Sequence, residues 1–316
     1  MPYSDRMQRS HLYSVFFAPR GLYRIADLGM QIAQQYLSPF DKLIGLVGEA
    51  GSGKSVLIKG MFPGLELTND DGGVNIRPLP ILSIADEDDT GFYNPHTYHL
   101  DIRFESAFVQ MHELATAILT AVNMGRRVIV EHFDLIYPHL DRNAHLLIGI
   151  GEEVIITRPT LFGPEPQDIA DIVFNSIPYR RMVHSAEDLC CFVLKKEWGI
   201  SQDMYIHADV RHGFILSFAQ KPDIDIPKLQ EIINRLIDED LEISFLDDSS
   251  ILIDDETYEC SFPRNHVRST GEIKKLVFGG ELMKEPITER YLLVGVVGDW
   301  AGQDIRDLNK IKIIGG

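Results

Sequence analysis

The sequence has few cysteines and no long apolar run, and each shortage excludes a class of protein. Only three residues are cysteine, and because Cys190 and Cys191 are adjacent, a disulfide framework is not expected. The three cysteines could instead take part in thiol chemistry or bind a metal. No apolar run approaches the ~20 residues that a membrane-spanning helix requires. The N-terminal stretch lacks the apolar core and cleavage site of a secretory signal, so we expect a cytoplasmic protein without a membrane partner.

Positive charge is also scarce. The chain carries 30 Lys and Arg against 47 Asp and Glu, a net charge of −17, and acids exceed bases in both halves. Because affinity for a nucleic-acid backbone comes mainly from Lys and Arg, this charge disfavours tRNA or DNA as a partner, although it leaves tRNA open. Neither repeats nor composition indicate an oligomeric state.

Apolar runs and helical patterns alternate in the first part of the chain. Helical spacing occurs in residues 23–37 and 107–125, with a further helix from residue 55, and strand-like apolar runs occur in residues 42–48, 79–89, 126–136, 143–150 and 152–159. This alternation predicts an α/β domain over residues 1–180, in which a parallel sheet carries helices on both faces.

The pattern changes after about residue 180. Helices are predicted for residues 184–198 and 226–241, and short strands follow through residue 300 without strand–helix alternation. The sequence therefore predicts a second, smaller α+β domain over residues 181–316.

A glycine-rich stretch, "GEAGSGKS", follows the apolar run at residues 42–48 and precedes a helix. It fits the pattern G-x-x-x-x-G-K-[ST], whose backbone N–H groups surround phosphate oxygens. In this pattern the lysine meets the β- and γ-phosphates and the serine holds Mg²⁺. The sequence thus predicts binding of ATP and Mg²⁺ by Gly48, Glu49, Ala50, Gly51, Ser52, Gly53, Lys54 and Ser55.

Residues 128–138, "VIVEHFDLIYP", resemble the "VIVEG" strand and following turn of the uridine kinase and phosphoribulokinase family, and "SIADEDDTGFY" is similar to that family's short acidic motif. The resemblance implies a P-loop kinase domain in which Lys54, Asp86 and Glu131 are catalytic: Asp86 as the general base and Glu131 as a Mg²⁺-linked acid. His132 occupies the place of the family's glycine. Any of the three acids after Asp86 offers an alternative, as does a solvated acidic loop.

Three arginines are further candidates for nucleotide contacts. Arg158, Arg180 and Arg181 follow the predicted strands, where they could steady a transferred phosphate as lid arginines do. Isolated surface arginines are the alternative interpretation.

The stretch "NHVRSTGEIKKLVF", residues 265–278, is similar to a signature of the second additional domain of alanyl-tRNA synthetase, which also occurs in free-standing editing proteins. Three patterns of that family precede it in the same order: "HSAEDLCCFVLKKEWG", "VRHGFILSFA" and "IPKLQEIINRLIDEDLEISF". The resemblance covers residues 182–280 and implies an editing-type domain that recognises an amino acid, an aminoacyl ester or another small ligand.

The same resemblance implies a Zn²⁺ site on His184, Asp188, Cys260 and His266. His184 and Asp188 are four residues apart, so they share one helix face. Asp188 stands where the family has a second histidine, and Phe262 stands where it has the thiol, two residues after Cys260. A buried thiol with hydrogen-bonded histidines is the alternative, and His207 and His212 are interpreted as ordinary surface or core histidines.

Three functions follow as hypotheses. The first is an ATP-dependent phosphotransferase that acts on a small hydroxyl-bearing metabolite, with the second domain recognising a ligand. The second is an aminoacyl-tRNA deacylase gated by an NTPase domain. The third is a nucleotide-dependent sensor without catalysis.

Overall fold

The chain forms two compact units. The computed structural model describes residues 13–67, 81–82, 96–159, 161–247, 249–260, 265–298 and 305–309. Of these, residues 13–16 and Tyr23–Asn175 belong to the first unit, whereas Phe17–Leu22 and the residues from Ser176 onward belong to the second. The division lies between Asn175 and Ser176, whereas the predicted boundary is at residue 180.

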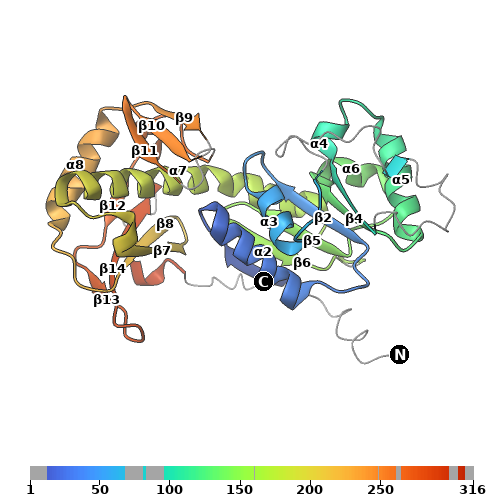
Figure 1. Ribbon diagram of the computed structural model, residues 1–316, viewed down its shortest axis with the longest axis horizontal. Helices are drawn as coiled ribbons and strands as arrows, with labels where there is room; N and C mark the ends of the chain where they lie inside the picture. The colour runs from blue at the N-terminus through green and yellow to red at the C-terminus, as the bar shows by residue number, and fades with distance from the viewer. Residues whose placement is uncertain are drawn as a thin grey trace. The chain divides into compact units, whose positions relative to one another are not determined.

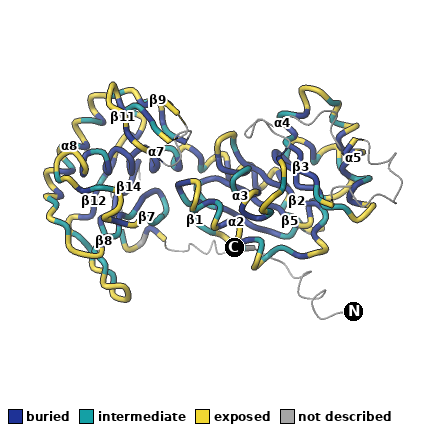
Figure 2. Tube along the Cα trace, in the orientation of Figure 1, coloured by how far each residue is buried: buried dark blue, intermediate teal, exposed yellow. Residues whose placement is uncertain are grey.

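The first unit is built on a six-stranded mixed sheet with the order β1-β6-β5-β2-β4-β3 (Figure 1). Its strands are β1 (Tyr13–Phe17), β2 (Leu43–Gly48), β3 (Thr97–Asp101), β4 (Arg127–Glu131), β5 (Leu146–Ile150) and β6 (Glu153–Thr157). Every residue of β2 and β5 is buried, which fits strands covered on both faces (Figure 2).

Four strands of this sheet are parallel, but β6 is not. Strand β2 is parallel to β4 and β5, and β3 is parallel to β4. Strand β6 is antiparallel to β5, with Leu147 opposite Thr157, so the prediction of a purely parallel sheet is wrong here. The reason is the connection: only two residues separate Ile150 from Glu153, and parallel neighbours need a crossover of a dozen or more.

The helices of the first unit follow the predicted pattern closely. Those predicted for residues 23–37 and 107–125 are confirmed, whereas the strand predicted for residues 126–136 ends at Glu131, where His132 takes a left-handed conformation. The strand predicted for residues 79–89 lies almost entirely outside the described residues. The helices are α2 (Leu22–Tyr36), α3 (Lys54–Met61), α4 (Ile102–Glu105), α5 (Met111–Asn123) and α6 (Phe133–Ile136), with a 3₁₀ turn at Tyr137–His139.

One helix, α7 (Pro166–Trp198), contributes residues to both units. The sequence predicts a helix only from residue 184, yet α7 begins at Pro166, a residue well suited to the first turn because its missing N–H needs no partner there. Pro178 lies inside the helix and removes one i to i−4 hydrogen bond. Neither α7 nor any other helix among the described residues combines the length and apolar character that would let it cross a membrane.

The described residues of the second unit form antiparallel sheets and, besides α7, the amphipathic helix α8. All strand pairs among these residues are antiparallel, in agreement with the predicted α+β pattern. The elements are β7 (Tyr205–Val210), β8 (Gly213–Phe218), α8 (Ile226–Asp238), β9 (Ile243–Asp247), β10 (Ser250–Ile253), β11 (Glu256–Glu259), β12 (Leu276–Phe278), β13 (Met283–Lys284) and β14 (Tyr291–Val297), with 3₁₀ turns at Gln202–Met204, Thr270–Ile273 and Ile305–Asp307.

The "TGEI" residues of the sequence motif form the 3₁₀ turn against the end of α8. The Thr270 hydroxyl donates to the carbonyl oxygen of Leu236 at 2.5 Å and accepts from the N–H of Leu241 at 2.8 Å. The N–H of Gly271 donates to Asp240 Oδ1 at 3.0 Å. Because these bonds satisfy backbone groups at the helix end, the motif has a structural role here.

Candidate functional site

The glycine-rich loop, residues 48–55, turns sharply between β2 and α3. Gly51 and Gly53 have φ of 78° and 95°, in the left-handed region that glycine adopts without strain. Gly48 also needs its small size, because an added Cβ would lie 2.9 Å from the Ser52 hydroxyl and 3.0 Å from the carbonyl oxygen of Ile150. The loop therefore depends on these glycines in this geometry.

Lys54 is 4% exposed and folds back over the loop. Its ammonium donates to the carbonyl oxygens of Gly48 at 3.2 Å and Glu49 at 2.9 Å. It also lies 3.7 Å from Glu131 Oε2. The charge thus lies inside the loop, where the oxygens of a bound anion can replace the carbonyl oxygens.

Glu131 ends strand β4 and is the centre of a buried polar cluster. Its Oε1 accepts a hydrogen bond from the Ser55 hydroxyl at 3.0 Å and lies 3.1 Å from His99 Nε2. Burial alone would raise the pKa of this carboxyl, but the hydrogen bonds of His99 and Ser55 and the charges of His99 and Lys54 outweigh burial and lower it. The site therefore holds an ionised carboxylate beside the serine of the loop.

Asp101 is a site acid that sequence reasoning missed. It ends strand β3 directly opposite Glu131, because β3 and β4 are parallel and in register there. Its carboxylate accepts from the N–H of Phe104 at 3.1 Å as the N-cap of α4. Burial, and then the charge of Glu131, raise its pKa. The only sequence signal was an acid at the end of "TYHLD", a run too polar to be recognised as a strand.

His132 follows Glu131 in a left-handed conformation, with φ 57° and ψ 46°. This is the region of backbone conformation that favours glycine. Burial, and then the charge of Lys54, lower the pKa of the imidazole to about 4, so His132 is neutral near pH 7.

Asp86, like the three acids after it, lies outside the described residues. Arg158, predicted as a nucleotide contact, lies away from the loop, since β6 runs antiparallel and ends beside the amino end of β5, at the edge of the sheet opposite the glycine-rich loop. Its guanidinium forms a bidentate ion pair with Asp41 at 2.5 and 2.8 Å.

Arg180 and Arg181 lie on α7 within the second unit, whereas the glycine-rich loop belongs to the first. Arg180 is 3% exposed, and its charge contributes to lowering the pKa of His184. The charge of Arg180 thus acts on a histidine of the second unit.

In the second unit, the four residues of the predicted metal site lie together. The candidate ligand atoms of His184, Asp188, Cys260 and His266 are all within 4.8 Å of one another. The helix α7 supplies the first two, and the residues around the end of β11 supply the others. The side chains of His184 and His266 are only 3% and 4% exposed, and that of Asp188 is 11% exposed.

The distances in this cluster suit a tetrahedral metal. Zn–N bonds of about 2.0–2.1 Å and a Zn–S bond of about 2.3 Å place nitrogen and sulfur ligands about 3.6 Å apart. Cys260 Sγ lies 3.6 Å from His184 Nε2 and 3.7 Å from His266 Nε2. Asp188 Oδ2 lies 3.5 Å from His184 Nε2 and forms a 2.7 Å hydrogen bond with His266 Nε2. The donor set and its spacing therefore fit Zn²⁺ without large movement.

The surrounding bonds orient these ligands. His184 Nδ1 lies 3.2 Å from the carbonyl oxygen of Asn265, which leaves Nε2 facing the cluster. The Ser185 hydroxyl accepts from the N–H of Val267 at 2.9 Å and fixes the chain beside His266. Burial, and then the charge of His266, lower the pKa of His184, which keeps the imidazole neutral as a metal ligand requires.

A second buried network lies beside the cluster on α7. Arg20 donates to Glu187 at 2.6 Å and pairs with Asp209 at 2.9 Å, and Glu187 also accepts from His207 at 2.9 Å. His207 is thus a hydrogen-bond partner of Glu187. This network fixes the residue next to Asp188 and so steadies that carboxylate.

Comparison with known proteins assigns no family. No protein-family model matches the chain, and a search of curated proteins returns no match.

Proposed function

We propose that the first unit binds ATP with Mg²⁺ and transfers the terminal phosphoryl group to a hydroxyl of a small metabolite. The observation that supports this most directly is the 3.0 Å hydrogen bond from Ser55 in the loop to Glu131 at the end of β4. A loop serine beside a carboxylate from the neighbouring strand is the arrangement in which phosphoryl-transfer proteins hold Mg²⁺. Lys54, already inside the loop, would meet the β- and γ-phosphates.

Asp101 is our choice for the general base. It projects from the strand next to Glu131, and burial and the Glu131 charge both raise its pKa, which makes a carboxylate a better proton acceptor. In this role its carboxylate would take the proton of the substrate hydroxyl as the oxygen attacks the phosphoryl group. Asp86, the base that the resemblance implies, is the alternative.

Nucleotide binding tests the first step. A fluorescent ATP analogue titrated with and without Mg²⁺ should bind the full chain, and Lys54→Met should weaken binding at least tenfold. The matched control is Lys59→Met, an exposed lysine on the same helix, which should bind like the parent. If Lys54→Met and Lys59→Met bind the ATP analogue with equal affinity, the proposed function is contradicted.

Phosphoryl transfer tests the second step. ATP turnover measured across a panel of hydroxyl-bearing metabolites should rise sharply with one class of acceptor. Asp101→Asn keeps a good helix cap but removes the base, so it should lose transfer while it still binds nucleotide. If Asp86→Asn loses transfer and Asp101→Asn does not, Asp86 is the base. Tight binding with no turnover on any acceptor would favour the sensor hypothesis.

A second candidate function rests on the four-residue cluster of the second unit. We propose that His184, Asp188, Cys260 and His266 hold Zn²⁺, which would act there as a Lewis acid, next to a ligand-recognition surface. The editing-type resemblance makes hydrolysis of an aminoacyl-tRNA ester the activity to examine.

Elemental analysis tests the metal independently of activity. The purified full chain should carry about one zinc per molecule, and His184→Ala or Cys260→Ala should lose it. Cys190→Ala, which removes a buried thiol outside the cluster, should retain it. Zinc retained equally by all three variants would exclude this ligand set, and loss of ester hydrolysis with the metal would support the deacylase.

A further inference from the structure

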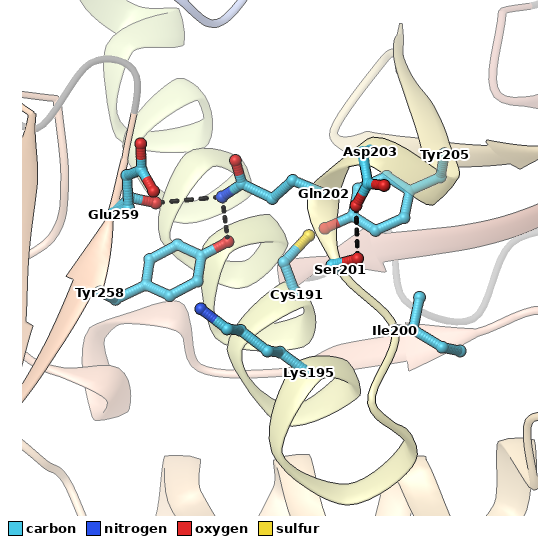
Figure 3. Close-up of a pocket in the computed structure, with 9 residues that line it drawn as sticks. All are labelled: Cys191, Lys195, Ile200, Ser201, Gln202, Asp203, Tyr205, Tyr258 and Glu259. Carbon is cyan, nitrogen blue, oxygen red and sulfur yellow. Dashed lines mark hydrogen bonds between the residues drawn. The ribbon is translucent and has the colours of Figure 1, made fainter.

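A small cavity opens in the second unit between α7, the 3₁₀ turn at Gln202–Met204, β7 and β11 (Figure 3). Its volume is about 160 Å³, well below the ~300 Å³ at which pockets for drug-sized ligands begin. Only a ligand of a few heavy atoms fits. Cys191 and Lys195 of α7 line it, and they continue the helix face that carries His184 and Asp188, at positions i, i+4, i+7 and i+11.

The inner part of the cavity holds a buried hydroxyl whose polar neighbour is a thiol. Tyr205 is 5% exposed, and its buried hydroxyl has no hydrogen-bonded nitrogen or oxygen among the described residues. Its polar neighbour is the thiol of Cys191, a weak partner. Burial raises the pKa of both groups, so both stay protonated and the phenol is a donor. Figure 3 shows the Tyr205 hydroxyl and the Cys191 sulfur turned toward the same space.

The rim of the cavity carries the positive charge of Lys195 and the amide of Gln202, which two hydrogen bonds hold in place. Lys195 is exposed at the mouth, so its ammonium can reach a bound anion. Gln202 donates to the Tyr258 hydroxyl at 3.0 Å and to the Glu259 carbonyl oxygen at 3.1 Å, which holds one wall in place. Of the two rim acids, Asp203 accepts from the Ser201 hydroxyl. The carboxylate of the other, Glu259, extends away from the tyrosine rings in Figure 3.

We propose that this cavity binds the carboxylate of a small organic acid, with the Tyr205 hydroxyl donating to one oxygen and Lys195 pairing with the charge. The Cys191 thiol is only a weak acceptor for this buried hydroxyl, and a carboxylate oxygen is a stronger one. The cavity size limits the acid to a few carbons. The site is independent of nucleotide binding by the first unit, so failure of either proposal leaves the other standing.

Titration of the full chain with small acids tests the proposal. Acetate, glycolate and L-alanine, followed by NMR chemical-shift changes, should bind in the millimolar range, whereas acetamide, which has the same shape as acetate without the charge, should bind at least tenfold more weakly. Tighter binding of L-alanine than of glycolate identifies an amino acid as the ligand, and the reverse order identifies a hydroxy acid. Equal binding of acetate and acetamide, or no binding of any acid, overturns the proposal.

Two substitutions test whether the acid binds in this cavity. Tyr205→Phe removes one hydroxyl, and Lys195→Met removes the charge at an exposed position that cannot affect folding strongly, so each should weaken acetate binding about tenfold. The matched control is Lys196→Met: Lys196 follows Lys195, pairs with Glu256 and does not line the cavity, so this variant should bind like the parent. If Lys195→Met and Lys196→Met bind acetate equally, the acid binds elsewhere and the assignment is wrong.

Discussion

At the scale of single residues, the first unit places one carboxylate among three polar partners. Glu131 contacts Ser55, His99 and Lys54 in a buried setting, and these contacts hold its pKa below the ordinary value. A carboxylate kept ionised beside a hydroxyl offers the oxygen ligands that a divalent cation prefers.

The substitution Glu131→Gln should separate binding from chemistry. The amide preserves the shape of the side chain but removes the charge, so we expect Mg²⁺-dependent turnover to fall by about two orders of magnitude. Nucleotide affinity without Mg²⁺ should stay within a factor of about two to three, within the usual spread of such measurements. Stopped-flow turnover and equilibrium titration measure the two quantities, and Glu113→Gln, an exposed acid on α5, is the control. Unchanged turnover would mean that Glu131 does not act with the metal.

At the scale of elements, the direction of strand β6 determines which residues Arg158 contacts. Because β6 is antiparallel to β5, Arg158 lies beside Asp41 before β2 and also donates to the carbonyl oxygen of Tyr36 at 2.6 Å. The arginine therefore joins the loop before β2 to the end of β6.

Removing this arginine should affect stability and leave nucleotide binding intact. Arg158→Met leaves Asp41 as a carboxylate that is only 3% exposed and has lost its ion-pair partner, so we expect the free energy of unfolding to fall by about 3 kcal/mol. Denaturant unfolding measures the loss, and titration with the ATP analogue checks binding on the folded protein. A variant of normal stability with weak nucleotide binding would restore the lid interpretation.

Helices α2 and α3 approach so closely that only glycine fits between them. A Cβ on Gly60 would lie 2.2 Å from the carbonyl oxygen of Ala26, and one on Gly29 would lie 2.4 Å from that of Leu57. Alanine favours a helix over glycine by up to about 1 kcal/mol, yet here it must push two backbones apart.

Gly60→Ala should therefore destabilise the protein by roughly 1–3 kcal/mol despite its better helix propensity. Chemical denaturation measures the change, with Lys59→Ala on the exposed side of the same helix as the control. A gain in stability for Gly60→Ala would show that the helices separate at little cost.

At the scale of the whole molecule, the candidate sites are divided between the two units. The glycine-rich loop and Glu131 belong to the first, and the four-residue cluster and the acid cavity belong to the second. Each ligand should therefore stabilise the unit that binds it.

Calorimetry should resolve this division. ATP with Mg²⁺ at about 100 times its Kd adds ~2.7 kcal/mol to the folded state that binds it, so it should raise one unfolding midpoint, and removal of zinc by a chelator should lower another. Lys54→Met should abolish the first effect and Cys260→Ala the second. A single transition that responds equally to both treatments would show that the units unfold as one.

The sequence by itself determined the parts whose signal is local. The glycine-rich loop requires glycines at fixed spacing, and the helices at residues 23–37 and 107–125 follow from apolar periodicity. These features could therefore be predicted from the sequence. His184 and Asp188 share a helix face for the same reason. Only the tertiary structure decided features that depend on strand direction and register: the antiparallel β6, the pairing of Arg158 with Asp41, and the position of Asp101 opposite Glu131. Those contacts join segments far apart in the chain, and no local pattern of residues specifies them.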